Sequence, residues 1–228
     1  MTPVMSEQTL ASRLKTETAE LHESMHELMG RLAPFARRDR YVRFVAAQYV
    51  FQCQVNALAD QPALHAMIPD LAQRTRVDAA RQDLIDLDAD LSVRCRTWLR
   101  DAAATTGAGE AGASSADAAP GRDAFPARAL GWLYVSEGST LGAAFLFKEA
   151  QTALNLSADF GARNLAASPA GRAQAWRAFV AALDARDLPR GHADQVVDGA
   201  REAFAFFGRT LRDAFSDAAP GASTAAPH

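Results

Sequence analysis

Residues 130–150, LGWLYVSEGSTLGAAFLFKEA, leave this chain few ways to fold. Their apolar character predicts a buried helix, yet Gly131, Gly138 and Gly142 are spaced by seven and four residues and so share one helix face. Each glycine inside a helix costs about 1 kcal/mol relative to alanine. The missing side chains therefore indicate a very close neighbour, which is another helix, a bend in the same helix or a flat ligand.

The whole chain has the composition of a helical domain. Its 228 residues suit one domain with a sizeable core, and 49% of them are apolar. Apolar residues recur at intervals of three and four, and no segment predicts a strand. We therefore expect an all-α single domain over residues 1–228. The predicted helices cover residues 7–31, 39–59, 76–87, 91–103, 124–154, 170–183 and 193–215.

Two segments are not expected to join the core. Residues 104–122 are rich in Gly, Ser and Ala and bury too little apolar surface to order themselves, so we predict a flexible loop there. Residues 216–228 predict a disordered tail.

Charge and hydropathy exclude several functions. The net charge of −3 gives no basic field for nucleic acid or an anionic membrane. The N-terminus lacks an apolar signal core, and no apolar run approaches the roughly 18 residues that cross a bilayer. We therefore expect a cytoplasmic protein with no membrane partner. Cys53 and Cys95 are far apart without metal-binding spacing, which favours buried free thiols.

His22 and Lys15 suggest what the flat ligand is. His22 lies at the edge of the apolar face of the first predicted helix, where a lone histidine usually makes only local hydrogen bonds. Lys15 lies on nearly the same face, about 10 Å away along the axis. That separation is comparable with the distance from a porphyrin iron to its propionates. Together they predict a haem site in which His22 binds iron, Lys15 binds a carboxylate and the glycine face covers the opposite side.

The sequence resembles the bacterial haem oxygenases over nearly its full length. Residues 130–150 resemble the distal-helix signature of that family, RFVAAQYVFQ at residues 43–52 resembles its second helix, and residues 159–183 resemble a later block. The spacing from RFVAAQY back to the family's proximal ligand leads to His22 rather than His26. The resemblance does not extend to the loop over residues 104–122 or to either terminus.

The resemblance implies an all-α fold in which haem is both cofactor and substrate, held between a proximal helix and a kinked distal helix. The implied reaction uses O₂ to cleave the porphyrin to biliverdin, CO and Fe²⁺. Electrons would come from a separate donor such as a ferredoxin or a flavin reductase, and we expect a monomer. Whether the product serves iron acquisition or supplies a bilin chromophore is left open.

The family's pattern also suggests roles for residues around the haem. Gly138 and Gly142 would let the backbone approach bound oxygen and leave room for water. Gln48 and Gln52, one helical turn apart, resemble residues that anchor such waters, although amides satisfied within the core are an equal alternative. Arg76 is a further candidate for the same network.

Tyr134 and Lys15 match a pair that contacts propionate in members that cleave at the α-meso carbon, so biliverdin IXα is the expected product. Members with altered regiochemistry carry lysines at positions that here are Gly30 and Glu149. His26 stands where a glutamate that hydrogen-bonds the ligand is common. We therefore expect a neutral, weakly polarised proximal imidazole.

Other functions compete with this interpretation. A di-iron carboxylate bundle needs two Glu-x-x-His motifs, and residues 23–26 supply one. A non-catalytic haem carrier or sensor would use the same pocket without turning haem over. A purely structural helical protein would use the glycines for close helix packing.

Overall fold

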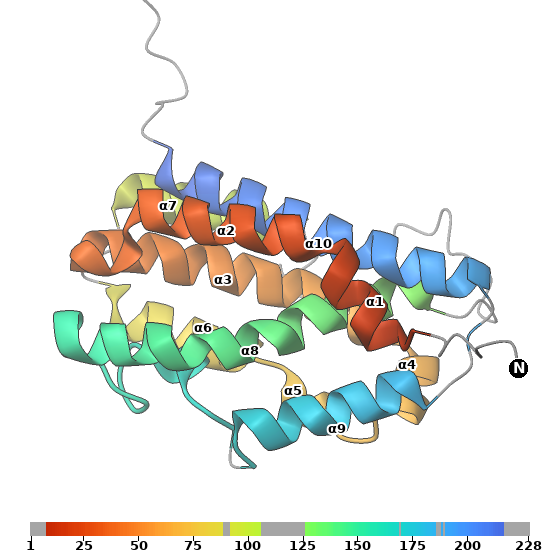
Figure 1. Ribbon diagram of the computed structural model, residues 1–228. Helices are drawn as coiled ribbons and strands as arrows, with labels where there is room; N and C mark the ends of the chain where they lie inside the picture. Colours follow the sequence, from red (N-terminus) through yellow and green to blue (C-terminus); the bar gives the residue numbers. More distant parts are fainter. Residues whose placement is uncertain are drawn as a thin grey trace, which may run out of the picture.

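The computed structural model describes residues 8–88, 92–105, 126–168, 170–185, 188 and 190–216. Within these residues only isolated bridges at Ser157 show β pairing, so the predicted all-α class is confirmed (Figure 1). The elements are α1 (Leu10–Glu17), α2 (Ala19–Leu32), η1 (Pro34–Ala36), α3 (Arg38–Ala59), α4 (Pro62–Met67), α5 (Leu71–Arg74), α6 (Val77–Asp86), α7 (Val93–Thr105), α8 (Ala127–Leu154), η3 (Arg163–Leu165), α9 (Arg172–Asp184) and α10 (Arg190–Phe215).

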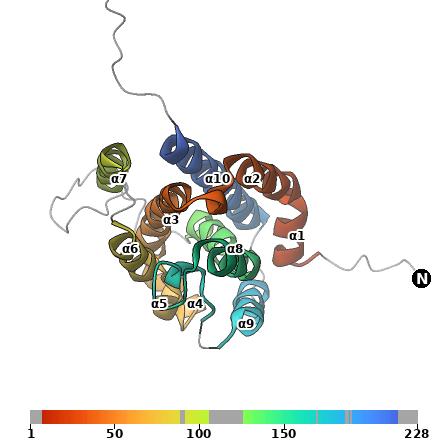
Figure 2. The same cartoon turned by 90° about the vertical axis from the view of Figure 1, so that its left-hand side faces the viewer.

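Three long helices form the centre of the molecule. α10 packs along both α8 and α3, and α3 also packs against α6, α7 and α8. Figure 1 shows α2 and α10 in the upper half of the molecule, with α8 and then α9 below them. Seen along the bundle, α1 and α2 lie on one side of α8, and α6 and α7 lie on the other (Figure 2). The predicted iron ligand His22 lies on α2 and the predicted glycine surface lies on α8, and both of these helices pack against α10.

The first predicted helix is in fact two helices, separated at Thr18. This residue leaves the helical region with φ −113° and ψ 7°. Its hydroxyl donates to the carbonyl oxygen of Leu14 at 2.8 Å, a side-chain bond that bends helices at threonine. The prediction of one helix over residues 7–31 is therefore wrong. Lys15 and His22 lie on different helices and do not share a single axis.

The remaining helical predictions are confirmed to within a few residues. They correspond to α3, α6, α7, α8, α9 and α10. The short helices α4 and α5 were not predicted, because such short segments cannot display a helical periodicity. Residues 106–122 of the predicted loop and 217–228 of the predicted tail lie outside the described residues, and Ala104 and Thr105 belong to α7.

Gly131 and Gly199 mark a very close approach between α8 and α10. A Cβ atom on Gly131 would overlap the backbone of Val196 and Ala200. A Cβ atom on Gly199 would overlap the backbone of Arg128 in the same way. Gly131 therefore serves helix packing, which is one of the three alternatives that the sequence left open.

Candidate functional site

The surface of α8 that follows this crossing is open. A Cβ atom on Gly142 would have no neighbour within 4 Å, and one on Gly138 would meet only the Trp176 side chain of α9, 3.6 Å away. Leu141 and Phe145 share the face of these glycines and are 38% and 81% exposed. Neighbouring exposed apolar side chains that form a contiguous patch are typical of a surface that a ligand or partner covers. α8 therefore offers a bare apolar surface suited to a flat ligand.

His22 is exposed on α2. Its ring meets that of Phe204 in α10 edge-on, with the centroids 6.4 Å apart, and that of His26 with the centroids 4.6 Å apart. Although the residue as a whole is exposed, the loss of water from part of its ring, followed by the charge of the neighbouring His26, lowers the pKa of His22. The lowered pKa favours the neutral imidazole, which is the form that binds iron.

Lys15 lies on α1 and Tyr134 on α8, and both helices pack against α9. The carboxylate of Asp184 accepts a hydrogen bond from the backbone N–H of Ala11 in α1 at 2.9 Å. The ring centroids of Tyr134 and Trp176 are 5.5 Å apart. Burial, and to a smaller extent the charge of Asp184, raises the pKa of Tyr134. Lys15 is exposed and has no ion-pair partner among the described residues. Its ammonium group is therefore available to a carboxylate.

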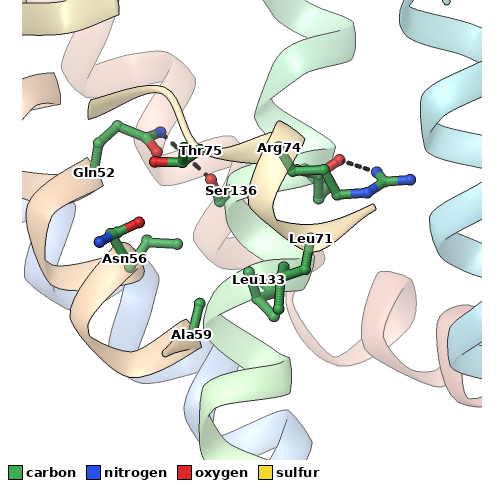
Figure 3. A pocket seen from close by; sticks show the side chains of 10 residues that line it. Gln52, Asn56, Ala59, Leu71, Arg74, Thr75, Leu133 and Ser136 are labelled. Carbon is green, nitrogen blue, oxygen red and sulfur yellow. Dashed lines mark hydrogen bonds and ion pairs between the residues drawn. The ribbon is translucent and has the colours of Figure 1, made fainter. Parts of the chain in front are cut away.

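Gln48 and Gln52 of α3 hydrogen-bond to two different elements. Gln48 Oε1 accepts from Asn164 Nδ2 of η3 at 2.7 Å. Gln52 Nε2 donates to Ser136 Oγ of α8 at 3.4 Å, beside a small cavity (Figure 3). Ser136 precedes Gly138 by two residues and so points to the opposite side of α8. Gln52 therefore lies behind the glycine-bearing surface.

Arg76 joins Gln48 through a shared partner. Its guanidinium donates to the backbone carbonyl of Asn164, whose side chain binds Gln48, and burial lowers the pKa of Arg76. Arg172 of α9 forms a second bridge, because it donates to Leu165 O of η3 at 2.5 Å and to Thr140 O of α8 at 2.8 Å. Arg76 and Arg172 thus both hydrogen-bond to the backbone of η3, and Arg172 also hydrogen-bonds to the glycine-bearing part of α8.

Sequence reasoning missed Glu137, the buried carboxylate that precedes Gly138. Arg74 of α5 donates to it at 2.5 Å, and the two side chains are 7% and 8% exposed. Burial raises the pKa of Glu137, and the charge of Arg74 opposes that rise. Arg74 also donates to Ala175 O of α9 at 3.2 Å, so it ties α8 to two neighbouring helices. The available signal was a lone acid inside an apolar helix, which requires a partner.

These observations define a class of protein, namely an all-helical protein with an exposed histidine on α2 and an open, glycine-bearing apolar surface on α8. Residues 8–213 match the family described as heme oxygenase. The chain is 43% identical over 222 residues to Heme oxygenase PigA of Pseudomonas aeruginosa, and the match covers 95% of this chain and 98% of that relative. The chain therefore belongs to the haem oxygenase family.

Solved structures of haem oxygenases have the same fold. The NO- and CO-bound enzyme of Neisseria meningitidis is 38% identical, with a TM-score of 0.73 over 93% of this chain and 95% of that one. Haem oxygenase-1 of Synechocystis in complex with haem has a TM-score of 0.61 over 90% of this chain and 91% of that one. At 20% identity, this second match shows the fold alone.

Family membership confirms the predicted enzyme, with haem as both substrate and cofactor, over the carrier, sensor and purely structural alternatives. The residues of this chain fit that ligand, because Gly142 borders open space and His22 is exposed. No group of three or more His, Cys, Asp or Glu side chains suited to a metal ion occurs among the described residues, so nothing there supports a di-iron site. Every helix in the described part of the chain is too short or too polar to span a bilayer.

Proposed function

We propose that this haem oxygenase uses O₂ to cleave haem at the α-meso carbon and releases biliverdin IXα, CO and Fe²⁺. The observation that carries the α-meso assignment is the placement of Lys15 and Tyr134 on two helices, α1 and α8, that both pack against α9. A cation and a neutral phenol there would hold a propionate and so set the rotation of the porphyrin. Gly30 and Glu149 supply no competing cation.

Each side of the haem receives a different contribution from the protein. His22 is the proposed iron ligand, and its lowered pKa favours the neutral imidazole. Haem supplies the iron that activates O₂. Gly138 and Gly142 add no acidic or basic side chain to this surface of α8, and the open space at Gly142 would leave room for O₂ and for water that carries protons.

We assign Gln48 and Gln52 indirect roles in the reaction. Gln52 binds Ser136 behind α8, and Gln48 binds Asn164, which Arg76 also holds. These bonds fix α3, α8 and η3 relative to one another. The two glutamines are therefore positioning residues that maintain the shape of the water-containing space and do not themselves touch haem.

The electron donor we propose is a separate ferredoxin or flavin reductase, acting on a monomeric enzyme in the cytoplasm. Arg37 and Arg40, which could attract an acidic donor, already have partners within the chain: Arg37 binds Asp39 at 2.9 Å, and Arg40 donates to Leu32 O at 3.0 Å. Turnover with each purified donor would identify the source of electrons. Light scattering of the haem complex would establish the number of subunits.

The product isomer tests the α-meso assignment. Haem-loaded protein is supplied with reductant and O₂, and the esterified bilin is separated by chromatography. We expect the IXα isomer to dominate, whereas β or δ isomers in the majority would refute the assignment. Changing Lys15→Ala together with Tyr134→Phe should give a mixture of isomers without abolishing haem uptake. Lys148→Ala, which removes the other lysine of the chain, is the matched control and should leave the isomer unchanged.

A further inference from the structure

α2 carries a pair of histidines, of which the proposed haem site uses only His22. Residues 22–26 are His-Glu-Ser-Met-His, so two histidines stand four residues apart on one helix. This spacing places both imidazoles on one face. A histidine pair so spaced, with glutamate after the first histidine, is a helical motif by which proteins bind zinc. The pattern therefore indicates a metal site that includes His22.

The separation of the His22 and His26 rings is compatible with a shared ion. Their ring centroids are 4.6 Å apart, and the ring planes are inclined by 64°. A ligating imidazole nitrogen lies about 2.1 Å from a first-row divalent ion, so each ring centroid lies about 3 Å from the metal. Two imidazoles separated by a right angle or a tetrahedral angle then have centroids roughly 4.5–5 Å apart. The observed separation falls within that range.

Both imidazoles are also available. His22 and His26 are exposed, and neither imidazole forms a hydrogen bond or ion pair with any described residue. No third His, Cys, Asp or Glu completes a cluster in the described part of the chain. An ion held by the pair would fill its other positions with water, which is typical of an exchangeable site rather than a closed structural one.

We propose that His22 and His26 together bind a first-row divalent cation in the haem-free chain. This inference rests on the proposed role of His22 as the iron ligand, because the cation and haem then exclude each other. Imidazole is a suitable ligand for Fe²⁺ as well as for Zn²⁺. The Fe²⁺ that the reaction releases therefore belongs to the class of ion that the pair accepts, and His26 offers it a second imidazole once the porphyrin has been opened.

Calorimetric titration of untagged, haem-free protein with Zn²⁺ tests the site, since Zn²⁺ has no redox chemistry. We expect one site, and an affinity at least about tenfold lower in His22→Ala and in His26→Ala because each variant keeps one imidazole. The matched control is His65→Ala, which removes an exposed histidine on α4 and should leave the affinity unchanged. Loading the wild type with haem should remove the Zn²⁺ site. Far-UV circular dichroism checks that each variant is folded.

Two results would overturn the cation site: no Zn²⁺ binding by the wild type, or equal binding by the wild type and His26→Ala. Undiminished Zn²⁺ binding by the haem-loaded protein would overturn the exclusion of the cation by haem and, with it, the role of His22 as the iron ligand. Haem uptake, followed by the Soret band, separates this proposal from the assignment of the iron ligand. A His26→Ala variant that takes up haem but not Zn²⁺ supports both. If His22→Ala formed the same haem complex as the wild type, His22 would fail as the iron ligand, while the Zn²⁺ titrations would still decide the cation site.

Discussion

The guanidinium of Arg74 lies 2.5 Å from the carboxylate of Glu137, and solvent is almost excluded from both side chains. Removing one member of such a pair strands a buried charge, which costs about 3–5 kcal/mol. Arg74→Met should therefore lower the free energy of unfolding by about that amount in urea denaturation. The double change Arg74→Met with Glu137→Leu should recover most of the loss, because neither charge is then left alone.

An exposed ion pair provides the control for this prediction. Arg81 lies 2.8 Å from Asp78, but the two side chains are 61% and 83% exposed. Surface pairs contribute about 0–1 kcal/mol, so Arg81→Met should scarcely change the free energy of unfolding. If Arg74→Met cost no more than Arg81→Met, the buried pair would not be what holds α8 to α5.

Cys53 and Cys95 are both free and buried, as the sequence predicted. Burial raises the pKa of each thiol above its usual range. Folding therefore favours the protonated thiol, and the stability that this contributes is present below about pH 8.5 and is lost as the pH rises through the raised pKa. We expect iodoacetamide at pH 8 to label both thiols far more slowly in the native protein than in urea, as followed by mass spectrometry. Equal labelling rates in the two states would contradict this prediction.

The helices and their breaks were not equally accessible from the sequence. α3, α8 and α10 are long, and the sequence predicts them from the one-sided apolar pattern of α10 and the long apolar segments of α3 and α8. The break at Thr18 could not be predicted, because the apolar pattern continues through it. It depends on a threonine hydroxyl bonding to Leu14 O, one of several partners open to that side chain.

The arrangement of the candidate site was also only partly predictable from the sequence. Gly131 and Gly142 share one face of the helix, so the sequence treats them alike, yet α10 packs on the first and leaves the second open. The sequence left open whether Gln52 anchors waters near the oxygen or is satisfied within the core, and its hydrogen bond to Ser136 on the far side of α8 could not be read from the sequence. These differences depend on which helix packs against which face, and that is a tertiary property that periodicity does not carry.

Because His22 is exposed, replacing it should abolish activity with little effect on stability. His22→Ala removes the proposed iron ligand and should abolish bilin formation from added haem. Because the side chain is exposed, the free energy of unfolding of the haem-free protein should change by less than about 0.5 kcal/mol. His65→Ala serves as the control and should retain full turnover. Wild-type turnover by His22→Ala would exclude His22 as the ligand.

Gly131 and Gly142 should respond oppositely to the same substitution. At Gly131 a methyl group would overlap the backbone of α10, so Gly131→Ala should lower the free energy of unfolding by about 1–3 kcal/mol or more. At Gly142 nothing lies within 4 Å, so Gly142→Ala should raise the free energy of unfolding of the haem-free protein by up to about 1 kcal/mol through helix propensity.

Gly142→Ala should be the more stable of these two variants but the weaker in binding or oxidising haem. The added methyl of Gly142→Ala occupies space on the open surface of α8, so this more stable protein should bind haem more weakly or oxidise it more slowly than the wild type. The folded fraction of Gly131→Ala should keep the wild-type haem affinity, because its methyl faces α10. A Gly142→Ala protein that was destabilised in urea would mean that protein atoms already cover this surface, and haem could not bind there.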